Sequence, residues 1–365
     1  MSHSMTQEKA TGRIRELDGW RALSASMVLI GHFLGHQHTQ KISRYPLLVS
    51  TIFHLSFLGV QIFFVISGFV ICRLLLREEA RHGAFSLKAF YVRRVCRIVP
   101  PFYLYLATAS LLGWFGLLEI TGAQVAKAGF FLADFHSLSA PWITGHTWSL
   151  AVEEQFYLFF PPALWLTPKR WRSAVGSGIC VVCIASILLI SFTKWNGTIS
   201  AGVMGGFLCI SCGVMAAIHE DRVRTVARKI PAFVVLLLAA MLMLHTFADL
   251  NEWKAAFYQA LVVPPAIVLV LFFTVERQSW LRSVLLTRPI QAIGLTSYAL
   301  YLWQQLFMGR PEVYFGTGHL IPLLSPLLCV IVPLSWFLIE KPAMRLGASL
   351  SRRLRQRQDA LNAIA

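Results

Sequence analysis

The sequence predicts an all-α polytopic membrane protein with about ten transmembrane helices and both termini in the cytoplasm. Three observations lead to this prediction. Only 14% of the 365 residues are charged and 56% are hydrophobic, whereas a soluble domain of this size has about 25% charged residues. Apolar stretches long enough to cross a bilayer recur along nearly the whole chain. Lys and Arg concentrate in every second connection between these stretches.

The apolar stretches define the predicted elements in chain order. They lie at about residues 17–37, 56–77, 99–118, 147–166, 172–191, 199–218, 230–247, 255–275, 290–309 and 319–340. We take residues 13–345 as one transmembrane domain. Residues 1–12 form a polar tail that is predicted to be disordered, and residues 346–365 form a basic cytoplasmic tail.

The distribution of charge supports this topology. The formal net charge is +16, and with cytoplasmic termini 26 of the 33 Lys and Arg residues fall on the cytoplasmic side and 6 on the other. Such a bias in short connections is typical of inward-facing loops. The positive charge is therefore largely a topological signal. Because no nucleic-acid-binding motif accompanies it, we expect membrane lipid rather than nucleic acid as a partner.

The first span, LDGWRALSASMVLIGHFLGHQH, carries ionisable residues at both ends. Arg21 and His32 are eleven positions apart, so they share one helix face roughly 16 Å apart along the axis. Ionisable groups inside a bilayer usually line a bundle interior or a wet cavity. The alternative is that Arg21 reaches the interface and that His32 makes a single helix–helix hydrogen bond. Asp18 lies one turn before Arg21.

Three arginines precede the third span. Residues 78–98 alternate apolar and basic side chains and are predicted to form an interfacial helix. Arg94 and Arg97 are i, i+3 neighbours on one face, and guanidinium groups in that arrangement suit phosphate oxygens. Arg93 is a weaker candidate for the same role. The alternative is topological charge that contacts lipid headgroups.

The fourth span opens with TWSLAVEEQFYLFFPP. Ser149, Glu153 and Tyr157 are spaced i, i+4, i+8 and form one stripe, with Glu154 beside it. Two adjacent carboxylates in a spanning helix indicate a function, unless this turn is interfacial and hydrated. At 1.5 Å per residue, His32 and Glu153 both lie roughly 8–10 Å below the outer surface, a match that predicts a base and its orienting carboxylate.

Three further features remain, and each has at least one structural explanation. Gln304, at the same predicted depth, is expected to donate to a carbonyl oxygen or to bridge helices. Gly59, Ser67 and Gly68 in GVQIFFVISGFVI favour close helix packing. The two CxxC pairs, Cys180–Cys183 and Cys209–Cys212, lie in apolar spans without nearby acids or histidines, so no metal site is predicted.

Taken together, these motifs resemble the membrane acyltransferase-3 family of O-acetylases. The resemblance covers the whole chain and rests on LDGWRALSASMVLIGH, GVQIFFVISGFVI, RRVCRIVP, TWSLAVEEQFYLFFP and SYALYLWQ in this order. It implies that Arg21 and His32 are required for activity. It further implies that Arg94 and Arg97 serve the acyl-CoA donor and that the Glu153 carboxylate is functional.

The chain departs from the family pattern in two respects. Many members have His where this chain has Gln304. Larger relatives carry an SGNH esterase-like domain, and we expect this chain to be a stand-alone transmembrane form in which any second transfer step needs another protein.

The predicted function is transfer of an acyl group, expected to be acetyl, from cytoplasmic acetyl-CoA to a hydroxyl of a cell-surface or lipid-linked carbohydrate. The expected location is a bacterial inner membrane. His32 acts as general base or carries the acyl group as an acyl-imidazole, and Glu153 orients it. The catalytic set is His32, Glu153 and Arg21; the donor set is Arg94, Arg97 and Arg93; the predicted substrate-binding residues are Asp18, Ser149, Glu154, Tyr157 and Gln304.

Two other functions are compatible with ten spans and central charges. A transporter or flippase for a lipid-linked saccharide is one, although such proteins often show internal repeats and none is visible here. A non-catalytic partner of a polysaccharide export complex is the other. It predicts that substitution of Arg21 or His32 costs nothing unless assembly is disrupted.

Overall fold

The computed structural model describes residues 13–34, 46–135, 142–193, 200–244, 252–309 and 311–364. Within these ranges the chain is helical, and its one β-type pairing is an isolated bridge between Leu118 and Tyr314. The prediction of an all-α fold is therefore confirmed for the described residues. The predicted disordered tail, residues 1–12, lies outside them.

The chain divides into two compact units, each built from several segments. The first comprises Met1–Val70, Gly176–Trp195 and Met204–Ser297, and the second comprises Ile71–Val175, Asn196–Val203 and Tyr298–Ala365. Helices α4, α9, α10 and α17 contribute to both. The two units are described separately below.

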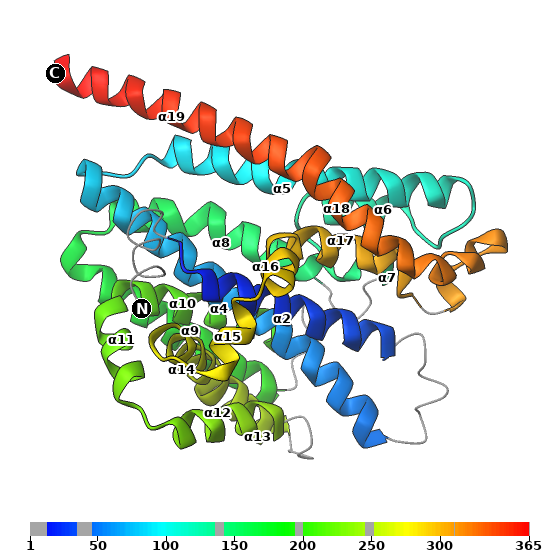
Figure 1. Ribbon diagram of the computed structural model, residues 1–365, viewed down its shortest axis with the longest axis horizontal. Coiled ribbons are helices and arrows are strands. Elements are labelled where there is room, and N and C mark those ends of the chain that lie inside the picture. The colour runs from blue at the N-terminus through cyan, green and yellow to red at the C-terminus, as the bar shows by residue number, and fades with distance from the viewer. Residues whose placement is uncertain are drawn as a thin grey trace. The chain divides into compact units, whose positions relative to one another are not determined.

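The first unit holds the N-terminal helix and the middle of the chain (Figure 1). Its helices are α2 (Arg15–His32), α4 (Pro46–His82, up to Val70), α9 (Arg172–Thr193), α10 (Ala201–Ile218), α11 (Glu220–Lys229), α12 (Ala232–Leu244), α13 (Glu252–Phe257), α14 (Val263–Glu276), α15 (Trp280–Leu285) and α16 (Arg288–Leu295). Helices α15 and α16 pack against α2. A π-turn, Tyr258–Val262, joins α13 to α14.

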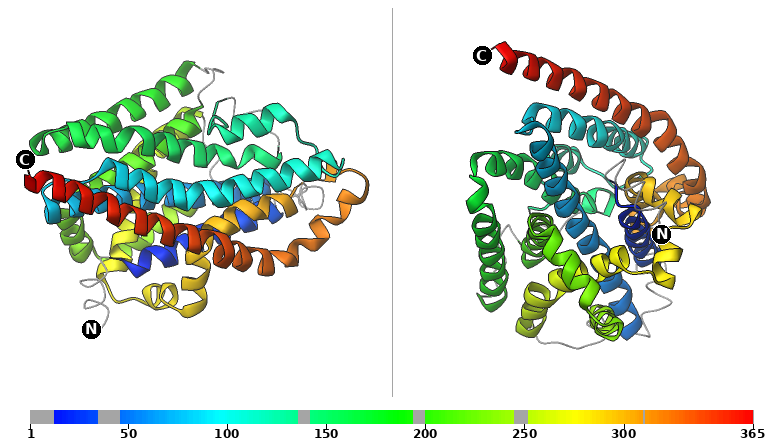
Figure 2. Two further views of the ribbon diagram at one scale, coloured as in Figure 1. Left: turned by 90° about the horizontal axis from the view of Figure 1, so that it is seen from above. Right: turned by 60° about the vertical axis from the view of Figure 1, so that its left-hand side comes forward.

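The second unit is built around α5 and the C-terminal helix. Its helices are the end of α4, α5 (Leu87–Trp114), α6 (Gly122–Gly129), α7 (Trp142–Gly145), α8 (Thr147–Leu166), α17 (Ser297–Phe307), α18 (Leu328–Ser335) and α19 (Lys341–Ile364), with short 3-10 and π turns between α17 and α19. The most extensive helix–helix contact in this unit is between α5 and α19, which lie side by side in Figures 1 and 2.

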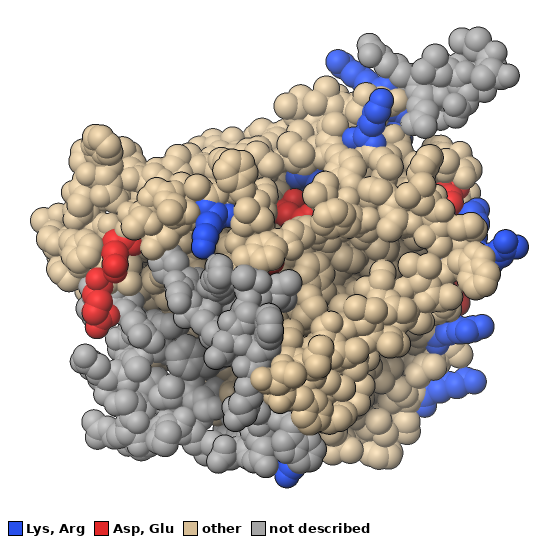
Figure 3. All heavy atoms as spheres, turned by 180° about the vertical axis from the view of Figure 1, so that it is seen from behind, with Lys and Arg blue, Asp and Glu red and all other residues tan. Residues whose placement is uncertain are grey.

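Six described helices are long and apolar enough to cross a membrane. They are His54–His82, Leu87–Trp114, Lys169–Thr193, Ala201–Ile218, Lys254–Glu276 and Pro322–Gln356. A seventh is possible if α11 and α12, which meet at 107°, form one bent span. The protein is thus a multi-pass membrane protein, and the predicted count of ten is not confirmed. Figure 3 shows a face on which charged side chains are sparse among the described residues, as expected for contact with lipid.

The arginines before the third span do not lie on a separate interfacial helix. Helix α5 begins at Leu87, where the Ser86 side chain accepts from the Ala89 N–H, and it continues through Pro100 and Pro101 to Trp114. Each of these prolines removes a helical hydrogen bond, yet the helix continues through both. Neighbouring helices in a membrane protein compensate for such losses, so a spanning helix tolerates them.

Helix α8 shows how one such loss is compensated. Pro162 has no N–H to donate to the carbonyl of Leu158, four residues earlier. The hydroxyl of Tyr91, on α5, donates to that carbonyl at 2.8 Å. The side chain therefore satisfies a backbone acceptor that would otherwise lack a partner, and it ties α8 to the same turn of α5 that carries the arginines.

Small residues allow the helices of the first unit to approach closely, as predicted. A Cβ at Gly59 would lie 2.7 Å from the Ser24 carbonyl oxygen of α2. A Cβ at Gly68 would lie 2.0 Å from the carbonyl oxygen of Ile210 on α10. Any larger residue would force α4 away from one of these helices, including the helix that carries Arg21 and His32.

Candidate functional site

Arg21 and His32 lie on one continuous helix, as predicted. Helix α2 runs from Arg15 to His32, so Arg21 is in its second turn and His32 is its last residue. Both side chains are half-buried. Arg21 donates from Nε to the Ser297 hydroxyl at 3.3 Å, and its guanidinium lies 5.9 Å from the ring centre of Phe63. Among the described residues it makes no ion pair.

The nearby carboxylate of Asp18 is engaged elsewhere. It accepts from Arg13 Nε at 2.8 Å. The backbone of Asp18 lies so close to α16 that a Cβ at Gly294 would stand 2.0 Å from its carbonyl oxygen. Asp18 is thus held by Arg13 and by helix packing, which leaves the Arg21 guanidinium without that carboxylate as a counter-ion.

Helix α2 is fixed by two long-range contacts that sequence reasoning missed. Glu16, which is buried, accepts from Arg282 on α15, with both Nε and Nη2 of the arginine 2.8 Å from Oε1. Trp20 donates to the Thr274 hydroxyl of α14 at 2.8 Å. The sequence signal was an acidic residue at the start of an apolar span. These contacts fix the rotation of α2, and therefore the face on which Arg21 and His32 lie.

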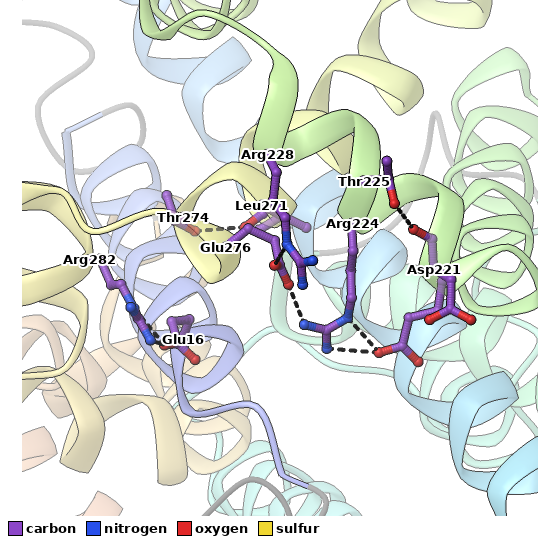
Figure 4. Close-up of polar contacts among 10 residues, drawn as sticks. Glu16, Asp221, Arg224, Thr225, Arg228, Leu271, Thr274, Glu276 and Arg282 are labelled. Carbon is purple, nitrogen blue, oxygen red and sulfur yellow. Dashed lines mark hydrogen bonds and ion pairs between the residues drawn. The ribbon is translucent and has the colours of Figure 1, made fainter. Parts of the chain in front are cut away.

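A second ion-pair network holds α11 against α14 in the same unit (Figure 4). Glu276, at the end of α14, accepts from both Arg224 and Arg228, the latter at 2.5 Å. Arg224 also pairs with Glu220 one turn earlier at 2.8 Å. Each carboxylate in this network is paired with an arginine, so a structural role explains the network without a ligand.

In the second unit, Arg94 contacts α8, the helix that carries Glu153 and Glu154. Its guanidinium lies 4.4 Å from the ring centre of Tyr157 on α8, and it is within electrostatic range of the Glu154 carboxylate. Like Arg21, Arg94 makes no ion pair among the residues that the structure describes. The sequence placed the arginine at the inner face and the acids near the outer surface, but α5 and α8 bring them into one neighbourhood.

The two adjacent glutamates of α8 have different surroundings. Glu154 is the one within range of Arg94, and its Oε1 is buried with no hydrogen-bond partner in the described part of the chain. Glu153 is half-buried and lies within electrostatic range of Tyr298 and Tyr301 on α17. The predicted pairing of Glu153 with His32 joins residues of different units and stays a prediction.

The first turn of α8 is connected to α17 by hydroxyl groups. Ser149 Oγ and the Tyr301 hydroxyl are 2.6 Å apart, and Tyr301 donates to the His146 carbonyl at 2.9 Å. Gln304 is buried on α17. Its neighbour Gln305 donates to the Trp142 carbonyl at 2.6 Å and thereby anchors α7.

The three arginines that precede the predicted third span lie in different environments. Arg93 Nη2 donates to Glu78 at 3.1 Å, whereas Arg94 turns toward α8. Arg97 lies within electrostatic range of Tyr298, which is half-buried and donates to the Ile98 carbonyl at 3.1 Å. The three arginines therefore do not form one cluster. Among the described residues no group of three or more His, Cys, Asp or Glu side chains is arranged to hold a metal ion.

Comparison with known proteins supplies the family. A family model described as an acyltransferase domain matches residues 14–340, which include α2, α5, α8 and α17. The chain belongs to the acyltransferase-3 family. This confirms the resemblance drawn from the motifs and places Arg21, His32, Arg94 and Glu153 inside the matched domain.

Several curated proteins are similar to this member of the family. A putative O-acetyltransferase of Staphylococcus aureus (SACOL0978) is 27% identical over 94% of this chain and 59% of its own length. A putative peptidoglycan O-acetyltransferase of Bacillus subtilis (YrhL) is 27% identical over 82% and 52%. The chain thus spans little more than half of these relatives. Nodulation protein 10 of Rhizobium leguminosarum is 26% identical over 96% of this chain and 98% of its own length. No solved structure matches the chain.

Proposed function

We propose that the protein is an integral membrane O-acyltransferase that moves an acyl group, acetyl in the simplest case, from cytoplasmic acyl-CoA to a hydroxyl of a cell-surface or lipid-linked carbohydrate. The membership of the acyltransferase-3 family and the names of the O-acetyltransferase relatives support the reaction class. A bacterial inner membrane is the location at which a cytoplasmic donor and an external acceptor meet.

The observation that carries the proposal is the environment of Arg21. A half-buried guanidinium inside an apolar bundle normally has a carboxylate partner, because an unpaired charge in a low-dielectric interior is costly. The described contacts of Arg21 are the Ser297 hydroxyl and the Phe63 ring, both neutral. A guanidinium held in this way suits a ligand oxygen that carries negative charge, such as a phosphate oxygen of the donor.

In the proposed reaction, the sugar hydroxyl attacks the thioester carbonyl of the donor. A new C–O ester bond forms and the C–S bond breaks. His32 takes the hydroxyl proton and passes it to the leaving thiolate, so that free CoA thiol is released. In the variant of this scheme, the acyl group first bonds to the imidazole and the sugar hydroxyl then displaces it. Arg21, roughly 16 Å from His32 along the axis of α2, contacts another part of the donor in either case, and Glu153 stabilises the imidazolium.

Arg94 and Arg97 are proposed to hold the donor phosphates. Arg94 supports this role because Tyr157 positions it through its ring face rather than through a carboxylate, so the charge is available to a phosphate. Ser149, Glu154, Tyr157, Asp18 and Gln304 are proposed to contact substrate.

The test is acetyl transfer by the purified protein in vesicles that contain a surface-glycan acceptor and labelled acetyl-CoA. The wild type is expected to acetylate the glycan, and His32→Ala is expected to lose activity by at least about a thousandfold while inserting and melting normally. Near wild-type transfer by this variant would remove His32 from the mechanism. Absence of donor-dependent transfer by the wild type would reject the function itself.

A further inference from the structure

Glu78, at the end of α4, connects this helix to α5 and to α19 in the second unit. Its side chain is 5% exposed. Oε1 accepts from the Ser86 N–H at 3.0 Å, at the start of α5. Oε2 accepts from Arg93 of α5 at 3.1 Å and from Arg355 of the C-terminal helix α19. One carboxylate oxygen therefore serves two guanidinium groups.

The neighbouring residue shows what a balanced pair looks like. Glu79 binds Arg172 through two parallel hydrogen bonds of 2.6 and 3.0 Å, so one carboxylate neutralises one guanidinium. Around Glu78 the same charge is shared between Arg93 and Arg355, which leaves this group with one excess positive charge. A purely structural link between α4 and α19 needs only one of the two arginines.

The two arginines also retain unused donors. Arg93 Nη1 and Arg355 Nε are buried without a hydrogen-bond partner among the described residues. The side chains as a whole stay 23% and 31% exposed, so the pair is accessible from the surface. Buried donors without acceptors are costly, and the shortage here is of acceptor oxygens and of negative charge.

A phosphate group would correct both shortages. It offers three or more acceptor oxygens and up to two negative charges, and guanidinium groups bind such oxygens in pairs. Arg93 is adjacent in sequence to Arg94, and α19 lies along α5 (Figures 1 and 2), so the pair lies on the predicted cytoplasmic side, next to Arg94 but on a different face of α5.

We propose that Arg93 and Arg355 form a phosphate-binding pair for which Glu78 is the resting counter-ion, and that this pair binds a phosphate of the acyl-CoA donor. This assignment rests on the proposed function. It makes the basic C-terminal helix part of the donor site and gives Arg355 a role that no sequence motif indicated. The chemistry recognised is a phosphate ester, which either CoA or a phospholipid headgroup can present.

The experiment measures the Kd of CoA and of adenosine 3′,5′-bisphosphate for the full chain in phosphatidylcholine nanodiscs. Arg355→Ala is expected to weaken both ligands about tenfold or more, as expected for a lost hydrogen bond to a charged group. The control is Arg353→Ala, an exposed arginine of the same helix, which removes the same charge and should leave both Kd values within about twofold. Equal binding by Arg355→Ala and Arg353→Ala would overturn the assignment.

Glu78→Gln separates a ligand site from a structural link. If Glu78 competes with phosphate, this variant binds CoA as tightly as the wild type or more tightly. If Glu78 only anchors α19, the variant weakens CoA as Arg355→Ala does, and the proposal is wrong. Should Glu78→Gln not fold, the comparison between Arg355→Ala and Arg353→Ala still decides.

The lipid and the donor are distinguished by repeating the titrations with phosphatidylglycerol added. If the two arginine variants differ only in these nanodiscs, and only in melting temperature, the phosphate belongs to the lipid and the donor assignment fails. If the wild type binds no CoA in either membrane, the proposed function loses its donor. Wild-type CoA binding with no effect of Arg355→Ala rejects the C-terminal site alone.

Discussion

Arg21 and Arg282 are two half-buried arginines of the same unit with opposite surroundings. Arg282 reaches helix α2 and finds the buried carboxylate of Glu16 at 2.8 Å. Arg21, less than two turns further along α2, finds a hydroxyl and an aromatic ring. An arginine side chain thus has a carboxylate partner at one position and only neutral partners at the other.

The arginines of the network in Figure 4 also have carboxylate partners. There Arg224 and Arg228 share Glu276, and Arg224 also has Glu220. Arginines that hold helices together in this protein have carboxylates of their own. Arg21 and Arg94 lack an ion pair within the described residues and lie on the motifs that mark the family. Ion pairing therefore distinguishes Arg21 and Arg94 from the arginines of these two networks, whereas Arg93 and Arg355 are intermediate because they share the single carboxylate of Glu78.

The largest expected effect tests the ligand side of this comparison. Arg21→Ala is expected to lower acetyl transfer by about a hundredfold, the loss expected when a charged hydrogen bond to the donor is removed, with little change in melting temperature. Steady-state transfer from labelled acetyl-CoA and thermal unfolding in detergent are the two measurements. A variant that unfolds early but retains its activity per folded molecule would place Arg21 among the structural arginines.

The next prediction concerns Arg282, whose expected role is to stabilise the fold. Arg282→Ala leaves the Glu16 carboxylate buried and unpaired, so we expect a loss of about 3 kcal/mol of stability and normal transfer per folded molecule. The control is the double variant Glu16→Gln with Arg282→Ala, which removes both charges and should recover part of the loss in thermal unfolding. If the double variant is less stable than the single one, the pair does not act through its charges.

Much of the fold could be predicted because its signals are local. Spanning helices are recognised by length and apolarity, and the eleven-residue spacing placed Arg21 and His32 on one helix. The prediction of a separate interfacial helix at residues 78–98 was wrong, because α5 runs from Leu87 through Pro100 and Pro101 to Trp114. Proline chemistry is local, but its compensation depends on neighbouring helices, as with the Tyr91 hydroxyl that covers the carbonyl opposite Pro162 on α8.

The partners of the site residues could not be predicted, because they are distant in sequence. Glu16 and Arg282 are 266 positions apart, and Glu78 and Arg355 are 277 apart. Residue type alone indicated that Arg93, Arg94 and Arg97 form one phosphate-binding group. The packing of α8 and α19 against successive faces of α5 turns Arg94 to one side and Arg93 to the other.

The smallest expected effect concerns Asp134, a buried carboxyl group without a described cation partner. Asp134, outside the spans, is 2% exposed, and its described side-chain partner is the Gln155 amide at 2.9 Å rather than a cation. Burial raises the pKa of this carboxyl, although hydrogen bonds from Gln155 and from backbone amides oppose the shift. The folded protein therefore binds a proton more tightly than the unfolded chain does.

The sign of the pH dependence follows from that shift. The stabilisation by protonated Asp134 is complete below the unfolded pKa of about 3.9, and it is lost as the pH rises through the higher folded value. Asp134→Asn cannot lose a proton, so the melting temperature of the wild type relative to this variant should fall as the pH rises from 4 toward neutrality. Melting curves recorded across this range test the point. Parallel curves for the two proteins would show that folding does not raise the pKa of Asp134, and that burial of this carboxyl is fully offset by its hydrogen bonds to Gln155 and to backbone amides.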